Sequence, residues 1–555
     1  MKKLLLTMSG LLIALCAAAT DFESAADAVK NMKVGWNLGN TLDANDGKAC
    51  PDIVRSETMW GQPVTRPELM AMLGEAGFGA VRVPVTWFPH MDADGKVDPV
   101  WMKRVHEVVD YVINAGLYCI LNVHHDTGDG NTHWLHASTA VYNTNKAKYE
   151  YLWQQIAEEF RDYGQQLLFE SYNEMLDKYN SWCFATFNTS NRYIAADAAD
   201  AYDAINSYAQ SFVNVVRATG GNNSQRNLVV NTYGACCGAG NWNAHLKDPL
   251  KQMKLPQDEA VGHLAFEVHT YPEVASLQSA KNEVNDIISA VRTHLVAKGA
   301  PVIFGEWGTA SADDYQNRHA NMLAFASYFV EQAKANDMGT FYWMGISDAS
   351  ARSLPAFSQS DLAAAILQAY YGDDYQPVLP TIDDFDITYT VSYTGQWQEL
   401  NLCDHEISPG DYKSVSVELG AVPASGLLQV KVYGATDDQG QYVPVSSATT
   451  TVNFNQSALG SKVRRITLQY MKTTPWQIGV NRAWLVKSDG TEVATQISPF
   501  WGCTAEAHAV STDVKRPVVY ARDDNRTYTL TGQAAPGVLR PGLYIRNGRK
   551  RVVFR

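Results

Sequence analysis

The sequence predicts an α/β fold, a (β/α)₈ barrel, followed by an all-β sandwich and a small C-terminal region. Two observations predict the barrel. Eight short runs rich in β-branched and aromatic residues alternate with longer amphipathic runs over residues 21–372. No GxGxxG motif follows any of these runs, so an open dinucleotide-binding sheet would lack its phosphate loop. After Tyr371 the pattern changes to a period of two with frequent turn residues, which predicts the sandwich.

The composition is that of a folded protein with more than one domain. At 555 residues the chain is too long for a single hydrophobic core. Hydrophobic residues make up 46% and charged residues 19%, which excludes a disordered chain and a long coiled coil. Acidic residues outnumber basic residues by 58 to 45, so we expect no nucleic-acid partner. The 14 Trp and 28 Tyr fit either stacking on sugar rings or a large core.

The first residues predict a secretory signal peptide over residues 1–19. Lys2 and Lys3 form a basic start, residues 4–15 are mostly apolar, and residues 17–19 offer a small-residue cleavage site. Cys16 is a candidate for lipid attachment, but the residue before it is bulkier than such a motif accepts. No later run reaches about 18 apolar residues, so we expect no transmembrane segment and a secreted or surface-attached protein.

The alternating runs assign the elements of the barrel in order. The eight predicted strands cover residues 33–38, 80–84, 118–123, 167–172, 227–232, 263–268, 301–304 and 339–342. The amphipathic runs between them predict helices at residues 66–76, 99–115, 149–163, 201–219, 280–298 and 314–336. The barrel domain is therefore predicted to cover residues 20–372.

Residues 373–381 are predicted to form a linker, because Gly, Pro and acidic residues follow one another there. The sandwich is predicted over residues 382–515, with strands that include 386–393, 412–419, 427–433 and 464–470. A C-terminal region is predicted over residues 516–555, and its last stretch carries basic residues and no acidic ones.

Chemically active residues gather where predicted strands end. Asn173 and Glu174 follow the fourth strand, and Glu306 follows the seventh. In such a barrel the ends of all strands meet at one mouth, where function resides. Two glutamates across one mouth suit glycoside hydrolysis, in which one protonates the leaving oxygen and the other attacks or activates water. The other polar or aromatic residues at these ends are Asn37, Arg82, His124, His125, His269, Tyr271 and Trp343.

Eight motifs, in order along the chain, resemble glycoside hydrolase family 5 in its bacterial endoglucanase branch, a family of TIM-barrel enzymes. They are GWNLGNTLD at 35–43, ETMWGQP at 57–63, VRVPVTW at 81–87, NVHHD at 122–126, FESYNE at 169–174, VHTY at 268–271, FGEWG at 304–308 and FYW at 341–343. The resemblance covers roughly residues 30–370 and touches every strand that the chemistry needs.

The resemblance implies that Glu174 is the general acid/base and Glu306 the nucleophile of a retaining double displacement. Their carboxyl groups should then lie about 5–5.5 Å apart. The nucleophile must be ionised, and a guanidinium at Arg82 and a hydroxyl at Tyr271 would stabilise its charge. Asn173 resembles the residue that binds the sugar 2-hydroxyl next to the cleaved bond.

The resemblance also implies roles for the remaining strand-end residues. His124 and His269 resemble residues that orient the sugar and the acid/base, and His125 can exchange roles with His124. Trp343 resembles the aromatic platform under the reactive sugar, and Asn37 is a candidate contact for a more distant sugar. Trp36, Trp60 and Trp87 are expected to pack in the core.

No cofactor or metal is predicted. His124, His125 and Asp126 are adjacent, but they lack the HExxH spacing of a zinc site and no further cluster completes them. Seven cysteines follow Cys16, and the candidate pairings are Cys183 with Cys236 or Cys237, and Cys403 with Cys503.

Three features leave alternatives open. Residues 344–348, MGISD, depart from the usual endoglucanase pattern, so cellulose, mixed-linkage glucan, xyloglucan and mannan remain candidate substrates. The sandwich aromatics Trp397, Tyr412, Tyr470, Trp476 and Trp501 either bind carbohydrate or fill a core. Residues 542–555 resemble the C-terminal sorting signal of type IX secretion cargo.

We therefore expect a secreted or surface-attached retaining endo-β-1,4-glucanase that acts on cellulose or mixed-linkage β-glucan. A xyloglucanase or β-mannanase on the same barrel is the alternative within this class. A non-catalytic surface glycan-binding protein is the alternative of another class. The expected partners are the β-glucan and the secretion machinery at the C-terminal tail, and the expected state is a monomer.

Overall fold

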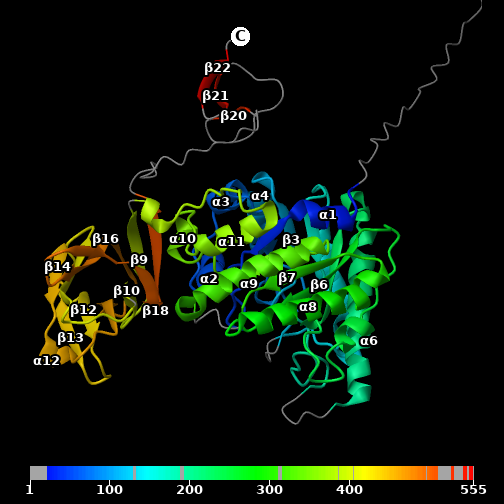
Figure 1. Ribbon diagram of the computed structural model, residues 1–555, viewed down its shortest axis with the longest axis horizontal. Coiled ribbons are helices and arrows are strands. Elements are labelled where there is room, and N and C mark those ends of the chain that lie inside the picture. Colours follow the sequence, from blue (N-terminus) through cyan, green and yellow to red (C-terminus); the bar gives the residue numbers. More distant parts are fainter. Residues whose placement is uncertain are drawn as a thin grey trace, which may run out of the picture.

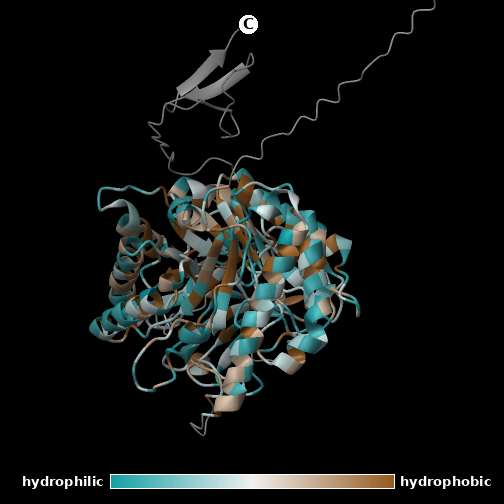
Figure 2. Ribbon diagram, turned by 90° about the vertical axis from the view of Figure 1, so that its right-hand side faces the viewer, coloured by the Kyte–Doolittle hydropathy of each residue, from teal (hydrophilic) through white to brown (hydrophobic). Residues whose placement is uncertain are grey.

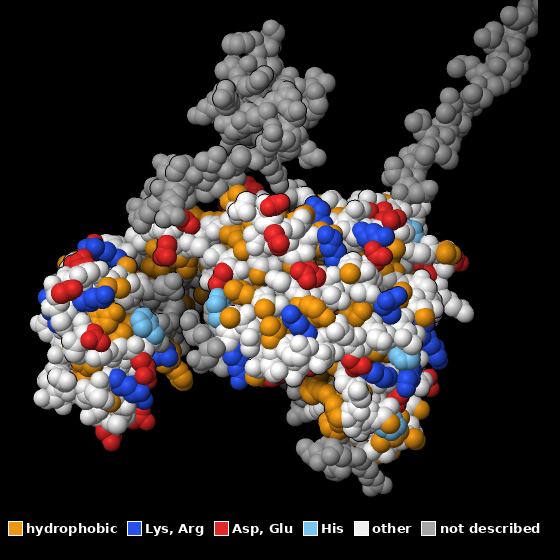
Figure 3. Space-filling view, viewed as in Figure 1, with side chains coloured by type: hydrophobic (Ala, Val, Ile, Leu, Met, Phe, Trp, Pro, Cys, Tyr) orange, Lys and Arg blue, Asp and Glu red, His pale blue; other side chains and the backbone are white. Residues whose placement is uncertain are grey.

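The computed structural model describes two bodies, a barrel wrapped by helices and a β module (Figure 1). The described residues are 22–128, 133–187, 193–309, 315–385, 387–403, 405–495 and 497–509, with short strands at 527–529, 542–546 and 549–553. The predicted signal peptide lies outside the described residues, as does most of the predicted C-terminal region. On the face shown in Figure 3, acidic and basic side chains are interspersed over both bodies.

Eight parallel strands close into a barrel in sequence order, from β1 to β8, which confirms the predicted fold class. The strands are β1 (Val34–Asn37), β2 (Ala80–Val83), β3 (Tyr118–Asn122), β4 (Leu167–Glu170), β5 (Leu228–Cys236), β6 (Leu264–Thr270), β7 (Val302–Trp307) and β8 (Gly339–Trp343). Each overlaps a predicted strand. The fifth, sixth and seventh run further than predicted, so their last residues reach the mouth.

Helices cover the outside of the barrel with their polar faces outward (Figure 2). Those at predicted positions are α3 (Pro67–Ala76), α4 (Pro99–Asn114), α5 (Thr139–Glu159), α6 (Ala195–Ala218), α8 (Leu277–His294) and α9 (Tyr315–Ala335). Those without a predicted counterpart are α1 (Ala25–Met32), α2 (Ile53–Thr58), α7 (Asp248–Gln252), α10 (Ser350–Ser353) and α11 (Ser360–Tyr371), with 3₁₀ turns η1 (Phe88–His90), η2 (Gly221–Ser224) and η3 (Val296–Lys298).

Local sequence signals explain where the helices begin and end. The side chain of Asp98 accepts a hydrogen bond from the Val100 N–H, and Pro99 occupies the first position of α4. Helix α3 likewise begins at a proline, and it is capped after Ala76 by Gly77, whose φ of 114° lies in the left-handed region. Helix α5 begins at Thr139 rather than at residue 149, because its first turns are mostly polar and give no apolar period.

The barrel interior is apolar at the end where the strands begin and polar at the mouth. Helix α1 closes the apolar end, where Val29 and Met32 pack with Ile120, Ile303 and other interior side chains. Above this layer the interior side chains are charged or amides. The fold therefore places a dry core below the mouth and collects the chemically active residues at the other end.

The β module is a sandwich of two antiparallel sheets, as predicted. The five-stranded sheet has the order β13-β12-β15-β10-β18, and the other has the order β14-β11-β16-β9-β19 with β17 beside β16. Their bounds are β9 (Ile387–Tyr393), β10 (Glu399–Cys403), β11 (Tyr412–Leu419), β12 (Leu428–Tyr433), β13 (Gly440–Pro444), β14 (Thr449–Asn453), β15 (Arg465–Tyr470), β16 (Trp476–Lys487), β17 (Glu492–Ala494), β18 (Ser498–Trp501) and β19 (Cys503–Ala509), with α12 (Gln456–Leu459) and η5 (Ile382–Asp384).

The barrel and the sandwich share apolar contacts. Ala351, Leu354 and Ala356, from α10 and the residues after it, belong to the hydrophobic cluster of the sandwich. An ion pair joins Arg66 of the barrel to Glu506 of β19. In the predicted C-terminal region, β20 (Thr527–Thr529), β21 (Gly542–Arg546) and β22 (Arg549–Val553) form an antiparallel sheet.

The disulfides considered from the sequence do not form. Cys183, Cys236 and Cys237 are free thiols. The thiol of Cys503 donates to the carbonyl oxygen of Glu399 over 3.0 Å, so it does not bridge to Cys403. Among the described residues, no helix is both long enough and apolar enough to cross a membrane.

Candidate active site

The two predicted glutamates meet at the mouth of the barrel. Glu306 lies on β7 and Glu174 lies just beyond the end of β4. One carboxylate oxygen of each, together with a ring nitrogen of His269, lies within 4.8 Å of the other two atoms. Because the side chains come from strands on different sides of the barrel, only closure of the sheet brings them together.

Glu306 is a buried carboxylate held by two donors. The guanidinium of Arg82 donates to Oε1 over 2.8 Å, and the hydroxyl of Tyr271 donates to Oε2 over 2.7 Å. Charge-assisted hydrogen bonds of this kind are short and strong, so they fix the orientation of the carboxylate. The structure thus places Arg82 and Tyr271 on the carboxylate for which they were predicted.

Arg82 is fully buried and joins several strand ends. Its guanidinium donates to both oxygens of Glu170, over 2.6 and 2.8 Å, and to Oδ1 of Asn173 over 2.8 Å. Burial alone lowers the pKa of Arg82, but the charges of Glu170 and Glu267 raise it well above its ordinary value. The side chain therefore stays charged and orients the groups around it.

His269 links the two carboxylates of the mouth. Its Nδ1 lies 2.8 Å from Oε1 of Glu174 and 3.6 Å from Oε2 of Glu306. Burial lowers the pKa of His269, but the carboxylates of Glu306, Glu174 and Glu267 outweigh that effect and raise the pKa to about 10. A cationic imidazole therefore lies between Glu174 and Glu306 at neutral pH and contacts both carboxyl groups.

The sequence analysis missed two buried acids, Glu170 and Glu267. Both lie inside predicted strands, and the signal that could have found them is an acid within an otherwise apolar run, LLFE and LAFEV. Burial, followed by the charge of Glu170, raises the pKa of Glu267. Together with Glu174 and Glu306 they make four carboxyl groups around the two cations Arg82 and His269.

His124 and Trp343 form one wall of the mouth. Their rings are parallel, with centroids 5.7 Å apart and planes 7° apart. Nε2 of His124 lies 3.9 Å from Oε1 of Glu306, and Nδ1 pairs with the amide nitrogen of Asn122 over 3.0 Å. Burial and then the charges of His125 and Arg82 lower the pKa of His124 well below its ordinary value, so this ring is neutral.

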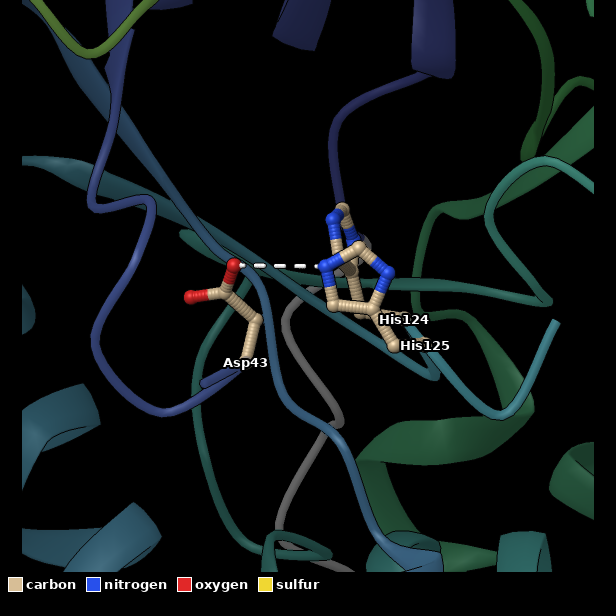
Figure 4. Close-up of side chains that lie close together, drawn as sticks. All are labelled: Asp43, His124 and His125. Carbon is tan, nitrogen blue, oxygen red and sulfur yellow. Dashed lines mark ion pairs between the residues drawn. The ribbon is translucent and has the colours of Figure 1, made fainter. Parts of the chain in front are cut away.

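His125 differs from His124 because it faces Asp43 (Figure 4). Nε2 of His125 lies 3.6 Å from Oδ2 of Asp43, and the ring stands edge-on to Trp60 with centroids 5.3 Å apart. Burial opposes protonation, but the hydrogen bond and charge of Asp43 raise the pKa of His125. The pKa values of the two histidines, which the sequence left interchangeable, are thus shifted in opposite directions.

Asp43, His124 and His125 offer three candidate metal ligands. Their ligand atoms lie within 4.8 Å of one another. The amide N–H of Asn122 donates to Nδ1 of His124, because Oδ1 of that amide accepts from the Val85 N–H. Nε2 of His124 therefore carries the proton and has no free lone pair, so this set does not suit a metal ion.

Asn37 does not match its predicted role. Its amide nitrogen donates to the Gly305 carbonyl over 2.9 Å and its oxygen accepts from Arg82 over 3.0 Å. The side chain is fully buried, so the expectation that it contacts a distant sugar is wrong. Trp36 and Trp87 lie in the core as expected, whereas Trp60 is 40% exposed beside His125.

A cavity of about 950 Å³ opens beside Glu174. Its lining includes Trp182, Trp242, His269 and Tyr271. Trp182 and Trp242 are 40% and 62% exposed, and the sequence analysis did not single them out because they lie in loops beyond β4 and β5. Exposed indole rings in a wide cavity suit stacking on pyranose rings.

A closed barrel that brings paired glutamates to the carboxyl ends of its strands has the architecture of a glycoside hydrolase. The family model of cellulase, glycosyl hydrolase family 5, matches residues 42–348. The chain belongs to this family.

Individual relatives agree with the family. The chain is 32% identical over 333 residues to Endoglucanase B of Neocallimastix patriciarum, which covers 58% of this chain and 64% of that protein. The first curated relatives are matched over 36–64% of their own length. Among solved structures, a GH5-4 broad specificity endoglucanase from an uncultured bacterium is 58% identical, with a TM-score of 0.62 and coverage of 63% of this chain and 97% of that one.

A second solved relative has a bound polysaccharide fragment. It is a glycoside hydrolase family 5 enzyme from Prevotella bryantii B14 in complex with the xyloglucan tetradecasaccharide XXXGXXXG. It is 42% identical, with a TM-score of 0.57 and coverage of 63% of this chain and 99% of that one.

Proposed function

We propose that this protein is a retaining endo-β-1,4-glucanase in which Glu306 is the nucleophile and Glu174 the acid/base. The separation of the two carboxyl groups carries the proposal, because one oxygen of each lies within 4.8 Å of the other. Retaining glycosidases hold these groups about 5–5.5 Å apart, whereas inverting ones leave about 6.5–9.5 Å for a water molecule. The tighter spacing supports attack by Glu306 itself.

The contacts of each glutamate suit its role. In the first step Glu174 gives its proton to the glycosidic oxygen, and a carboxylate oxygen of Glu306 bonds to the anomeric carbon as the bond to the leaving oxygen breaks. In the second step water attacks that carbon, Glu174 takes the proton of the water, and Glu306 leaves. Two donors on Glu306 hold its carboxylate in one orientation, while Glu174 is the more exposed of the two and lies where it can reach the glycosidic oxygen and then water.

The site has two sides, which we assign to the two ends of the cleaved chain. The cavity with Trp182 and Trp242 opens beside Glu174, so it suits the leaving sugars, which receive the proton from that residue. His124 and Trp343 lie beside Glu306 and suit the sugar that becomes bound to it. Sugar-binding groups on both sides of the scissile bond favour attack inside a polymer.

Xyloglucan is the second candidate substrate. The wide cavity beside Glu174 leaves space for branched sugars, and the Prevotella bryantii relative was solved in complex with a xyloglucan fragment. β-Mannan is a third candidate on the same barrel.

We further propose export of the protein, which rests on the sequence of residues 1–19 and on the basic, apolar tail at residues 542–555.

The test uses the full chain and four polymers: carboxymethyl cellulose, barley mixed-linkage glucan, xyloglucan and glucomannan. We expect release of reducing ends from the β-glucans, and NMR of fresh product should show the β-anomer first. Glu306→Gln and Glu174→Gln should abolish release, while Glu331→Gln on the outer surface of α9 serves as the matched control. A folded protein that binds but cleaves none of the four would overturn the proposal in favour of glycan capture.

The intact mass of the exported protein tests whether residues 1–19 are removed.

A further inference from the structure

The loop after β8 connects the mouth of the barrel to the sandwich. Trp343, the proposed platform for the sugar next to Glu306, ends β8, and residues 344–348 follow it. These residues are the ones whose sequence departs from the usual endoglucanase pattern, and they lead into α10. Helix α10 packs beside β19 of the sandwich, and Leu354 after it belongs to the hydrophobic cluster of the sandwich. One short segment therefore joins the sugar site to the second domain (Figure 1).

The loop contains two backbone conformations that non-glycine residues rarely adopt, with φ of 43° at Met344 and 47° at Ala349. Such conformations persist only where the surrounding structure enforces them. The indole N–H of Trp36 donates to the Met344 carbonyl oxygen over 3.0 Å. The amide of Gln62 accepts from the Ala349 N–H over 2.9 Å and donates to Oδ1 of Asp348 over 3.1 Å. Contacts with the rest of the barrel, rather than local preference, therefore set the shape of the loop.

Arg352 of α10 is the central contact of this loop, and its side chain is buried. Its Nε donates to the Ser347 carbonyl oxygen over 2.8 Å, and one terminal nitrogen donates to the Gly39 carbonyl oxygen over 2.9 Å. The other terminal nitrogen donates to Oδ1 of Asp348 over 3.2 Å, and the guanidinium carbon lies 4.9 Å from the ring centroid of Trp36. One planar group thus ties the loop after β8 to the loop after β1, which the compact ammonium of a lysine cannot do in the same geometry.

The loop after β1 touches the platform itself. A Cβ on Gly39 would lie 2.9 Å from the indole of Trp343 and 3.0 Å from Cγ of Met344, so the backbone of Gly39 packs directly against both. The same indole is parallel to the ring of His124, with centroids 5.7 Å apart. Because Arg352 holds the carbonyl group of Gly39, its hydrogen bonds fix one of the surfaces against which the platform packs.

Helix α10 and the residue after it present side chains to both domains. Arg352 reaches into the barrel, whereas Ala351 and Leu354 belong to the hydrophobic cluster of the sandwich. We propose that Arg352 is a positioning residue, which sets the orientation of the platform Trp343, and that the sandwich supports the sugar site by holding α10. This inference rests on the function proposed for the barrel, since it concerns the sugar bound next to Glu306. It gives the sandwich a role in the reaction that needs no sugar contact of its own.

The experiment measures sugar affinity in the full chain with Glu306→Gln, by calorimetry with a soluble cello-oligosaccharide. Arg352→Lys keeps the charge and loses the fork that reaches both loops, so we expect an affinity about fivefold weaker. Arg226→Lys is the matched control, because Arg226 is also buried and donates to the carbonyl oxygens of Phe160 and Leu167, at the end of the barrel where the strands begin. Both variants are expected to unfold at a lower temperature, but only Arg352→Lys should lose affinity.

A second pair of variants tests the support from the sandwich. Leu354→Ala shortens a side chain that anchors α10 in the sandwich cluster, and it should weaken the affinity about twofold. Leu459→Ala removes the same atoms from the same cluster at α12, on the far side of the sandwich from α10 (Figure 1), and should bind like the parent. Gln62→Ala, which removes the amide contacts to the same loop, should weaken binding as well, and it replaces Arg352→Lys if that variant does not fold.

The comparison of affinities separates the possible failures. Equal affinities of Arg352→Lys and Arg226→Lys would overturn the positioning role, and a loss in Arg352→Lys with none in Leu354→Ala would overturn the role of the sandwich alone. Hydrolysis of the same oligosaccharide by the parent, with Glu306 restored, tests the proposed function separately. If the parent binds the sugar but does not cleave it, the proposed function fails, while the affinities still decide the role of Arg352. A parent that binds no oligosaccharide would overturn both.

Discussion

Oε1 of Glu267 lies so close to Gly305 that a Cβ on that glycine would sit 1.7 Å from it. The carboxyl group that contacts His269 and Arg82 therefore packs directly against the backbone that precedes Glu306. A glycine is required here for space, since its backbone dihedral is not in the left-handed region.

Gly305→Ala is expected to destabilise the fold by about 3 kcal/mol, because the added methyl overpacks a site that has no flexible neighbour. Urea unfolding followed by tryptophan fluorescence measures this. Gly164→Ala is the control, since a methyl group at that position would meet no atom of the described chain within 4 Å. Equal stability of the two variants would contradict the packing that we describe.

Tyr271→Phe is expected to lower kcat about ten- to a hundredfold with little change in KM. The substitution keeps the ring and removes the hydroxyl that donates to Glu306 over 2.7 Å. A hydrogen bond to a charged group is worth about 1.5–3 kcal/mol. Initial rates on a soluble oligosaccharide provide the measurement. An unchanged kcat would show that this bond does not support the reacting carboxylate.

The free energy of unfolding should fall as the pH rises from about 7 to about 10, in part because of His269. Its pKa is raised to about 10 in the folded chain, above its ordinary value of 6.5. Below pH 6.5 the imidazole is protonated in both the folded and the unfolded chain, and the ion pairs of His269 contribute fully to stability. Between pH 6.5 and about 10 only the folded chain binds the proton, so this contribution to the free energy of unfolding is lost as the pH approaches 10. Urea unfolding at several pH values should show a shallower decline for His269→Gln. Identical declines would contradict the charge that we assign to this ring.

Trp182→Ala and Trp242→Ala are expected to lower kcat/KM for long oligosaccharides about tenfold and to change it little for substrates with a short leaving group. The reason is the lost stacking area on the side of the cavity next to Glu174. A series of cello-oligosaccharides and aryl glycosides gives the comparison. An equal loss of kcat/KM for all substrates in the series would show that these two rings do not bind the leaving-group sugars.

The order of strands and helices was predictable from residue patterns because each barrel strand is buried on both faces and forms a short apolar run in the sequence. The same apolar pattern led the sequence analysis to miss Glu170 and Glu267, since an acidic residue inside an apolar run suggests the end of a strand rather than a functional group. Helix α7 was missed because its five residues give no period. The structure settles these cases because closure of the barrel decides which side chains share its interior.

The residues of the mouth were found because they follow strands, but sequence position does not tell which way a side chain points. Asn37 and Asn173 both lie at strand ends and both bond to Arg82, yet Asn37 also binds the Gly305 carbonyl below the mouth. His124 and His125 are neighbours in sequence, yet their pKa values shift in opposite directions, and Asp43 beside His125 is the largest charged contributor to that difference.

Ala351, Leu354 and Ala356 bury their side chains in the core of the sandwich although they precede the predicted linker. Cutting the chain between the two domains would therefore expose these apolar side chains on the barrel domain. It would also leave a cavity in the hydrophobic core of the sandwich. The backbone agrees, since the Phe357 N–H donates to the Pro380 carbonyl over 2.7 Å across the same junction. The sandwich buries apolar side chains that belong to the end of the barrel domain, so the two domains are expected to unfold in one thermal transition.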